Sequence, residues 1–350
     1  MAASVTDGGD LLVEGDADGL VEIVAVGEGS FQVSDNGVVV ADGSTLTGVT
    51  DDIQIRLEDA AVDVNDAVTI DLAGQTVDTI YARLGGGDNT LDLFGGSAGR
   101  VLVRSGAGAD SISLGGVVTG RAHLALGAGD NSVLVVGELA GLAVHTGDGS
   151  DAVTIAADAA VTRSVMALLG AGDNSLTIDG SIAGGVAVST RDGSDAVVIG
   201  ESASLGGSAR LSLGDGDNTA DVAGTIDGSL LYAGGDGSDV VALAATSDVA
   251  GDATGRLGDG SNSWTADGVV GGDLNVVSLN ADDVVTVGDE ATIGGETTIG
   301  VGEQTDLGFG CGRHHEHEGQ EHEGHGGFDG QSVMGRHLGG RVAALLQRLR

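Results

Sequence analysis

Aromatic residues make up only 2% of this 350-residue chain, so any buried core has to be built from Val, Leu, Ile and Ala. Cys311 is the single cysteine, which excludes an internal disulfide and is compatible with an extracellular repeat protein. No apolar run approaches the ~18 residues that a membrane span needs. Residues 1–7 carry neither a basic nor an apolar stretch, so no cleavable secretory signal is expected.

Lysine is also absent. All 14 basic residues are arginines, and with 53 acidic residues they give a net charge of -39. Such a surface repels nucleic acid and anionic lipid and attracts cations, although solvation alone would also account for it. Hydrophobic residues reach 41%, which is enough for a packed core and speaks against disorder.

Glycine, in contrast, is abundant, with 66 residues. Many of these glycines belong to a recurring element that consists of Gly, one variable residue, Gly and two polar residues. The last polar member of each copy is Asp66, Asn89, Asp110, Asn131, Asp151, Asn174, Asp195, Asn218, Asp239, Asn262 and Asp283. Successive members lie 20 to 23 residues apart, and the later steps alternate between 21 and 23, which makes a 44-residue double repeat. A period near 22 with strand chemistry predicts one turn of a β-solenoid per repeat.

Alternating apolar and polar residues follow each copy, as in Ser175–Ile178, and this period of two points the apolar side chains to one face. The sequence therefore predicts an all-β protein, a parallel β-helix or β-solenoid of about eleven rungs over residues 61–302. Ile178 and Ile199 are expected to stack at equivalent inward positions of adjacent rungs.

The two ends of the chain lack the repeat frame. Residues 1–60 are strand-like and are expected to form an N-terminal β cap over the open sheet edge. Residues 303–330 read as a Gly/His/Glu-rich linker. Residues 331–350 are expected to form a short C-terminal amphipathic helix that caps the rod or self-associates.

The glycine-rich corners resemble the nonapeptide repeat of RTX (hemolysin-type) calcium-binding proteins, best at Gly147–Val153 and Gly235–Val241. In that family, Asp carboxylates and loop carbonyls of adjacent turns hold Ca²⁺ in a parallel β-roll, and export needs no N-terminal signal. Here the motif occurs once per rung instead of in tandem, and about half of the copies end in Asn.

The resemblance implies calcium as the cofactor. Because corners from residue 148 onward gain a second acid, calcium should favour the stretch from 190 to 260. The candidate ligands are Asp148, Asp151, Asp192, Asp195, Asp215, Asp217, Asp236, Asp239 and Asp259.

The polar column also has a metal-free interpretation. Asp and Asn alternate along its last members without exception. Two carboxylates stacked ~4.8 Å apart would repel by about 3 kcal/mol at an effective dielectric constant of ~20, and alternation relieves this repulsion. Asn can in addition hydrogen-bond along the stack. A calcium site and a purely structural polar ladder both remain open at this point.

A histidine tract near the C-terminus is the second candidate metal site. Its members are His314, His315, His317, His322 and His325. Imidazoles at this density suit Zn²⁺ or Ni²⁺, but their spacing fits no closed tetrahedral site, and a solvated linker is the alternative.

Enzyme activity is not expected. Rungs of 20 to 23 residues leave no room for the long loops that wall a catalytic cleft, the carboxylates are evenly spread, and His123 and His145 look isolated. The favoured function is that of a non-enzymatic, calcium-binding structural or adhesive element, exported to the surface or beyond by a signal-less route.

Metal cations, self-association and cell-surface or matrix polymers are the expected partners. Nucleic acid and a transmembrane segment are not expected. A self-assembling cytoplasmic β-helix scaffold is the first alternative function, and a polysaccharide-acting β-helix enzyme is the second.

Overall fold

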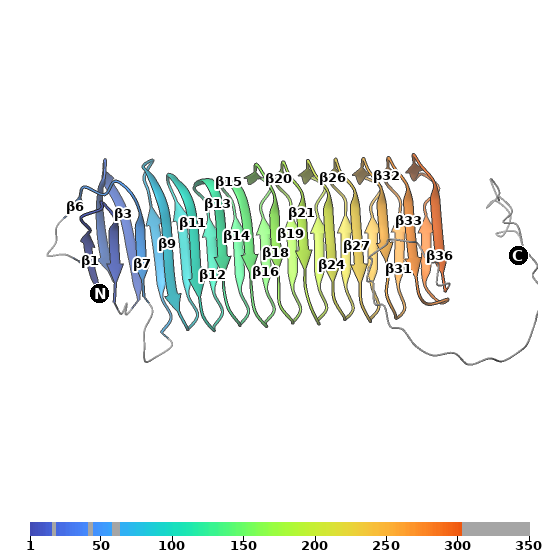
Figure 1. The fold of residues 1–350 in the computed structure, drawn as a ribbon, viewed down its shortest axis with the longest axis horizontal. Helices are drawn as coiled ribbons and strands as arrows, with labels where there is room; N and C mark the ends of the chain where they lie inside the picture. Colours follow the sequence, from blue (N-terminus) through green and yellow to red (C-terminus); the bar gives the residue numbers. More distant parts are fainter. Residues whose placement is uncertain (16–18, 41–44, 58–63, 303–350) are drawn as a thin grey trace, which may run out of the picture. The chain divides into compact units, whose positions relative to one another are not determined.

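The computed structural model describes residues 1–15, 19–40, 45–57 and 64–302, and within these ranges the regular structure is all strand (Figure 1). Met1–Thr305 form one compact unit. The predicted linker at 303–330 and the predicted helix at 331–350 lie outside the described residues. The all-β expectation is therefore confirmed for the described part of the chain.

Two stacked-strand walls make up this unit. Sheet A has 21 strands: β1 (Ala2–Val5), β2 (Leu11–Glu14), β7 (Ile53–Arg56), β9 (Thr76–Gly85), β11 (Ser97–Ser105), β13 (Val117–Ala125), β15 (Glu138–His145), β17 (Ala160–Val161), β18 (Val165–Leu168), β20 (Ser181–Ile182), β21 (Val186–Ser189), β23 (Ser204–Leu205), β24 (Ala209–Leu213), β26 (Thr225–Ile226), β27 (Leu230–Gly234), β29 (Asp248–Val249), β30 (Ala253–Arg256), β32 (Val269–Val270), β33 (Leu274–Ser278), β35 (Thr292–Ile293) and β36 (Thr297–Val301).

Sheet B has 15 strands: β3 (Leu20–Gly27), β4 (Ser30–Asp35), β5 (Val38–Val39), β6 (Leu46–Thr47), β8 (Ala67–Asp71), β10 (Thr90–Phe94), β12 (Ser111–Leu114), β14 (Ser132–Val135), β16 (Ala152–Ile155), β19 (Ser175–Ile178), β22 (Ala196–Ile199), β25 (Thr219–Val222), β28 (Val240–Leu243), β31 (Ser263–Ala266) and β34 (Val284–Val287).

Each turn contributes a strand to sheet B and then one long strand or two short strands to sheet A. From β8 onward every pairing in sheet B is parallel. Ile178 pairs with Ile199 in this register, and both side chains are fully buried. The predicted solenoid of about eleven turns and its inward register are thus confirmed.

The core between the walls is a continuous stack built mainly of Val, Leu, Ile and Ala side chains, with Phe31, Tyr232 and Trp264 as its aromatic members. Inward residues alternate with half-buried ones along typical wall strands such as β16, β19 and β22. Because one face of each wall is fully dry, a one-residue slip would bring polar side chains into the core, which fixes the register.

The N-terminal segment extends the solenoid and also closes it. Strand β2 pairs in parallel with β7, and β7 pairs in parallel with β9, so the stacking continues across the predicted boundary at residue 60. The outermost strands run antiparallel: β1 covers β2, and β4 covers β3. Short antiparallel strands are a common way to protect a sheet edge from pairing with another chain.

The other end of the described stack is more open. Its last strands, β34 and β36, carry apolar side chains that are largely exposed, with Val284 at 57% and Ile299 at 43%. Within residues 64–302 no strand runs antiparallel over this edge.

Candidate metal centre

The corners between sheet A and sheet B are built on a column of glycines. Gly193 and Gly216, each two residues before a ladder residue, have φ angles of 145° and 123°. A Cβ on Gly216 would also collide with the carbonyl oxygen of Gly193 in the preceding turn. Only glycine fits this conformation and this spacing, and the resulting tight turn directs the next polar side chain into the wall.

That polar side chain belongs to a buried ladder of alternating Asp and Asn. The Asn174 backbone N–H donates to Oδ1 of Asp195 at 2.9 Å, and its side-chain Nδ2 donates to the same oxygen at 2.9 Å. The Asp195 N–H in turn donates to Oδ1 of Asn218 at 3.0 Å. The same backbone bond links successive members from Asp66 to Asp283, so the metal-free ladder of the sequence analysis is present.

A second column, missed in the sequence, explains why the ladder alternates. The residue five positions before each ladder Asn is a buried leucine: Leu84, Leu126, Leu169, Leu213 and Leu257. The residue five positions before most ladder Asp residues is instead a hydroxyl: Ser105, Thr146, Thr190 and Ser278.

A hydroxyl at this position can serve the second carboxylate oxygen of the ladder Asp. In the last turn, Ser278 donates to Oδ2 of Asp283. In the turns of Asp151 and Asp195 both the hydroxyl and Oδ2 are buried, and among the described residues neither has a hydrogen-bond partner. Each is therefore the available partner of the other, because an unpaired buried polar atom is costly.

The Asp239 turn solves the same problem in another way. Gly234 stands at the hydroxyl position, and a Cβ there would collide with Oδ2 of Asp239. The fully buried Tyr232 supplies the hydroxyl instead. Burial and the neighbouring Asp239 carboxylate raise the pKa of Tyr232, so the phenol remains a donor.

Burial dominates the titration of two ladder carboxylates, Asp110 and Asp239. Burial raises the pKa of Asp110, and the hydrogen bonds from Ser105 and Asn89 offset this only in part. Burial likewise raises the pKa of Asp239 against the bonds from Asn218 and Tyr232.

The predicted calcium ligands fall into two sets on opposite sides of the wall. Asp151, Asp195 and Asp239 belong to the ladder, are at most 2% exposed, and accept hydrogen bonds from the preceding turn. The other members are exposed on the outer rim of the corners: Asp148, Asp192, Asp215, Asp217, Asp236 and Asp259. The two members of a predicted pair such as Asp192 and Asp195 therefore differ in exposure, and calcium binding by these residues stays a prediction.

The rim aspartates form a column of their own. The Asp236 backbone N–H donates to Oδ1 of Asp215 at 2.9 Å, and Asp236 forms a parallel bridge with Asp259. Asp148 lies 3.7 Å from Arg191, with both side chains more than 70% exposed. We call Asp192, Asp215, Asp236 and Asp259 the acidic ridge, since they lie on consecutive turns.

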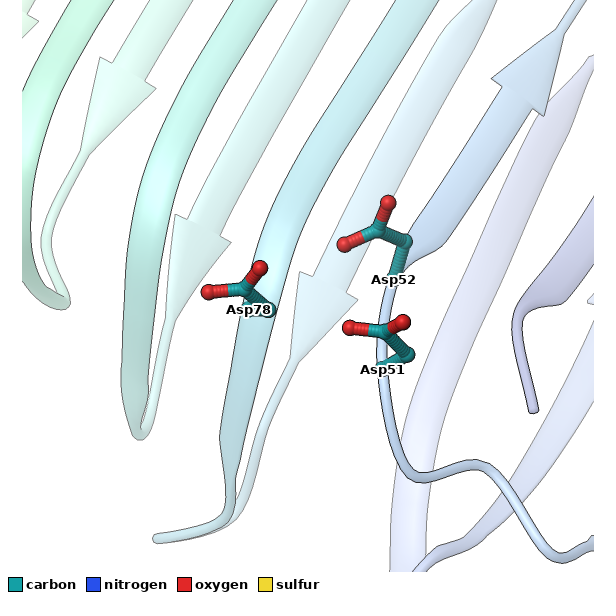
Figure 2. Close-up of side chains that lie close together, drawn as sticks. All are labelled: Asp51, Asp52 and Asp78. Carbon is teal, nitrogen blue, oxygen red and sulfur yellow. The ribbon is translucent and has the colours of Figure 1, made fainter. Parts of the chain in front are cut away.

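Three other carboxylates come together where the N-terminal segment meets the first turn. Asp51 and Asp52 precede β7, and Asp78 lies in β9 (Figure 2). Their ligand atoms lie within 4.8 Å of one another. Among the described residues, these three form the one group of at least three His, Cys, Asp or Glu side chains that is close enough together to hold a metal ion. We call this group the acidic centre.

The acidic centre follows from strand register. Ile53 pairs with Ile80, and the Asp78 N–H donates to the Asp51 carbonyl at 2.9 Å, so the residues before the two strands align. The Thr79 N–H donates to Oδ1 of Asp52 at 2.9 Å. Burial, with added repulsion from Asp51 and Asp10, raises the pKa of Asp52.

An all-oxygen donor set with three carboxylates suits Ca²⁺, which takes six to eight oxygen ligands, and does not suit softer metals. The sequence analysis missed this group because Asp51 lies 27 residues before Asp78, outside the regular frame. The available signal was that both β7 and β9 have Asp residues close to their first residues, and that these two strands pair with each other.

A hollow of about 870 Å³ lies beside the N-terminal hairpin, between β3, β4 and residues 73–77. Glu28 is its one carboxylate among the lining residues, so it holds no acid pair. His123 and His145, expected to be isolated, instead stack with ring centroids 5.1 Å apart on the outer face of sheet A. Neither place assembles an acid, a base and a cleft.

The histidine tract, His314 to His325, lies outside the described residues. In the part of the chain that the structure describes, no helix has the length and apolarity needed to cross a membrane.

Comparisons with known proteins find little. No protein-family model matches the chain, which leaves the RTX resemblance without that support, and no curated protein matches it either. Among solved structures, the chain is similar to a hyperactive, Ca²⁺-dependent, β-helical antifreeze protein from an Antarctic bacterium. The identity is 19% over 71% of this chain and 80% of that chain, with a TM-score of 0.43.

Proposed function

We propose that this protein is a non-enzymatic, calcium-binding structural solenoid, and that calcium acts at the acidic centre. The observation that carries the proposal is the approach of Asp51, Asp52 and Asp78 to within 4.8 Å at the junction of the N-terminal segment and the first turn. Three carboxylates this close repel one another. A bound Ca²⁺ would neutralise them and hold β7 against β9.

The buried ladder supports a stabilising role and not a catalytic one for the metal. Successive ladder residues are linked to one another by hydrogen bonds to Oδ1, so the ladder joins its turns without an ion. Calcium at the junction would act on the attachment of the N-terminal strands. Linkage predicts a stabilisation of about 2.7 kcal/mol at a calcium concentration 100 times Kd.

Calorimetric titration with Ca²⁺, combined with thermal unfolding, tests this proposal on the full chain. We expect binding heat and a raised Tm in the wild type. Both should disappear in the Asp51→Asn, Asp52→Asn, Asp78→Asn variant. The matched control replaces Asp192, Asp215 and Asp236 with Asn and should bind like the wild type.

The two triple variants separate the possible results. Loss of heat only in the Asp192, Asp215, Asp236 variant would move the site to the acidic ridge, where the sequence analysis places it. Absence of heat in the wild type would refute calcium binding and leave a metal-free solenoid.

We extend the proposal to place the protein at the cell surface or outside the cell, as a structural or adhesive element in contact with surface or matrix polymers. The supports are the acidic surface and the scarcity of cysteine. Detection of the intact mass in culture supernatant tests export. Recovery of the chain only from the cytoplasm would contradict it and favour the cytoplasmic scaffold.

Transition-metal binding by the histidine tract is a separate proposal. Deletion of residues 313–350 should abolish Ni²⁺ or Zn²⁺ retention and leave the solenoid folded. Nickel affinity that persists in the shortened chain would exclude the tract as the chelator.

A further inference from the structure

Positive charge is concentrated on one part of this acidic protein. Five of the nine arginines among the described residues lie on β7, β9, β11 and β13, and none of their side chains belongs to the core: Arg56, Arg83, Arg100, Arg104 and Arg121. Tyr81, His123 and His145 lie on the same strands or the next one, β15. We call these eight residues the basic face.

Strand register brings the basic face together. Arg83 pairs with Arg56 on one side and with Arg104 on the other, which makes a column of arginines over three consecutive strands. The Arg83 guanidinium lies 5.1 Å from the centre of the Tyr81 ring. Burial, then His145, Arg104 and Arg121, lower the pKa of His123, which shows how close these groups are.

Carboxylates are scarce over the later part of this face: Glu14 on β2 is the register partner of Arg56, whereas the register partners of Arg100, Arg104 and Arg121 are not acidic. Among the described residues, no Asp or Glu forms an ion pair with Arg100, Arg104 or Arg121. Arginine and tyrosine are the residues that protein interfaces favour, and lysine, which this chain lacks, is depleted there. The basic face therefore has the composition of an interaction surface for an acidic partner.

The acidic ridge provides matching chemistry at the far end of the same stack. Its carboxylates occupy consecutive turns, so they repeat with the ~4.8 Å spacing of the strands, as the arginine column does. Arg104 lies six residues before the ladder residue of its turn, and Asp215 lies three residues before its own. Both columns thus run along the corner side of sheet A, one over the early turns and one over the late turns.

We propose that two copies of this chain associate side by side and antiparallel, with the basic face of each on the acidic ridge of the other. A two-fold axis perpendicular to the stack places early turns of one copy beside late turns of its partner, so both contacts form at once. Guanidinium and carboxylate columns with the same repeat can pair turn by turn.

Net repulsion between two acidic chains opposes this dimer. Salt screens this long-range repulsion first and the attraction between paired charges only at higher concentration. At 0.15 M ionic strength the Debye length is about 8 Å, so distant charges are screened while paired charges in contact still attract. At 1 M the Debye length is about 3 Å, and the contact attraction is weakened as well. Dimerisation should therefore be strong at moderate salt and lost at high salt.

Sedimentation velocity on the full chain, with EDTA to exclude calcium, tests the proposal. We expect a dimer at 0.15 M NaCl and a monomer at 1 M NaCl. Arg56→Gln with Arg104→Gln should weaken the dimer at least tenfold. Ser132→Glu with Thr177→Glu, on sheet B, makes the same change in net charge and should leave the dimer unchanged.

A charge exchange provides the sharper test. Arg56→Glu with Arg104→Glu, and Asp215→Arg with Asp236→Arg, should each give monomers alone. An equimolar mixture should form a one-to-one heterodimer, because both contacts regain opposite charges. A wild-type monomer at every salt concentration, or a mixture that stays monomeric, would overturn the proposal. Binding of dextran sulfate by a strictly monomeric wild type would do so as well, since the partner would then be a foreign polyanion.

Discussion

The inner and outer sides of the same corners use the same residue for opposite purposes. Asp195 is 2% exposed and accepts two hydrogen bonds from Asn174, whereas Asp192, three residues earlier, is exposed on the rim. The inner column is fixed by internal partners, and the outer column is left for ions or other chains. A carboxylate's role here is decided by the side of the wall it faces and not by the motif it belongs to.

A second contrast lies within the inner column. Turns with a ladder Asn place a leucine five residues earlier, as at Leu169 and Asn174, and turns with a ladder Asp place a hydroxyl there, as at Thr190 and Asp195. Asn fills its hydrogen-bonding capacity with corner carbonyls, such as Gly172 O at 2.8 Å from Asn174 Nδ2. The carboxylate of Asp has no N–H to donate, so its second oxygen needs a donor instead.

The largest effect should come from placing a charge on the inner side. Ile178→Asp buries an unpaired carboxylate between fully buried neighbours and should cost several kcal/mol of unfolding free energy or prevent folding. Thr177→Asp, one residue away on the outer face of β19, should cost less than about 1 kcal/mol. Urea unfolding of both variants measures the difference, and equal costs would contradict the register.

Next in size is the loss of a ladder residue. Asp195→Ala removes the acceptor for both Asn174 donors and should destabilise the protein by about 2 kcal/mol. Asp192→Ala, on the rim, should change the unfolding free energy by less than about 0.5 kcal/mol. Urea unfolding in EDTA tests the pair, and a rim substitution as costly as the ladder substitution would remove the distinction between the two columns.

The contrast between Asp and Asn turns predicts a coupling of about 1 kcal/mol. Thr190→Val should destabilise the wild type because it removes the hydroxyl available to the buried Oδ2 of Asp195, which has no other partner among the described residues. In an Asp195→Asn background the same change should cost little, because Val and Asn then reproduce the pattern of the neighbouring turns. A double-mutant cycle by urea unfolding measures the coupling, and additive costs would argue against the hydroxyl as partner.

The smallest effect is a dependence of stability on pH. Burial raises the folded-state pKa of Asp110 and Asp239 above the unfolded value near ~3.9, so the folded state binds more protons between the two values. The unfolding free energy should therefore rise as the pH falls from 7 toward ~4. Asp110→Asn with Asp239→Asn should flatten this slope, whereas Asp130→Asn with Asp173→Asn, on the rim, should not.

Much of the fold could be predicted because the repeat carries its own evidence. The spacing of the corner residues gave the turns, and the alternation in Ser175–Ile178 gave the inward face. The acidic centre could not be predicted, because it depends on how β7 aligns with β9 across an irregular segment. The direction of Asp195 was equally out of reach, since motif spacing does not say whether a corner side chain turns into the wall or away from it.

The same spacing also hid the reason for the alternation. Leu169 and Thr190 occupy equivalent positions, one apolar and one with a hydroxyl. The alternation of apolar and polar residues within a single strand does not distinguish such a substitution from ordinary sequence variation. The bond from Ser278 to Oδ2 of Asp283 in the last turn gives the difference a meaning.

The alternating ladder also constrains how such a chain can grow or shrink in evolution. Duplication or loss of a 44-residue segment, such as the one between Asp195 and Asp239, would join an Asn turn to an Asp turn again and preserve every bond. Duplication of one turn alone would bring two carboxylates or two amides into contact. Homologues and engineered versions should therefore differ in length by even numbers of turns, because the hydrogen bond between neighbouring ladder residues requires Asp and Asn to alternate.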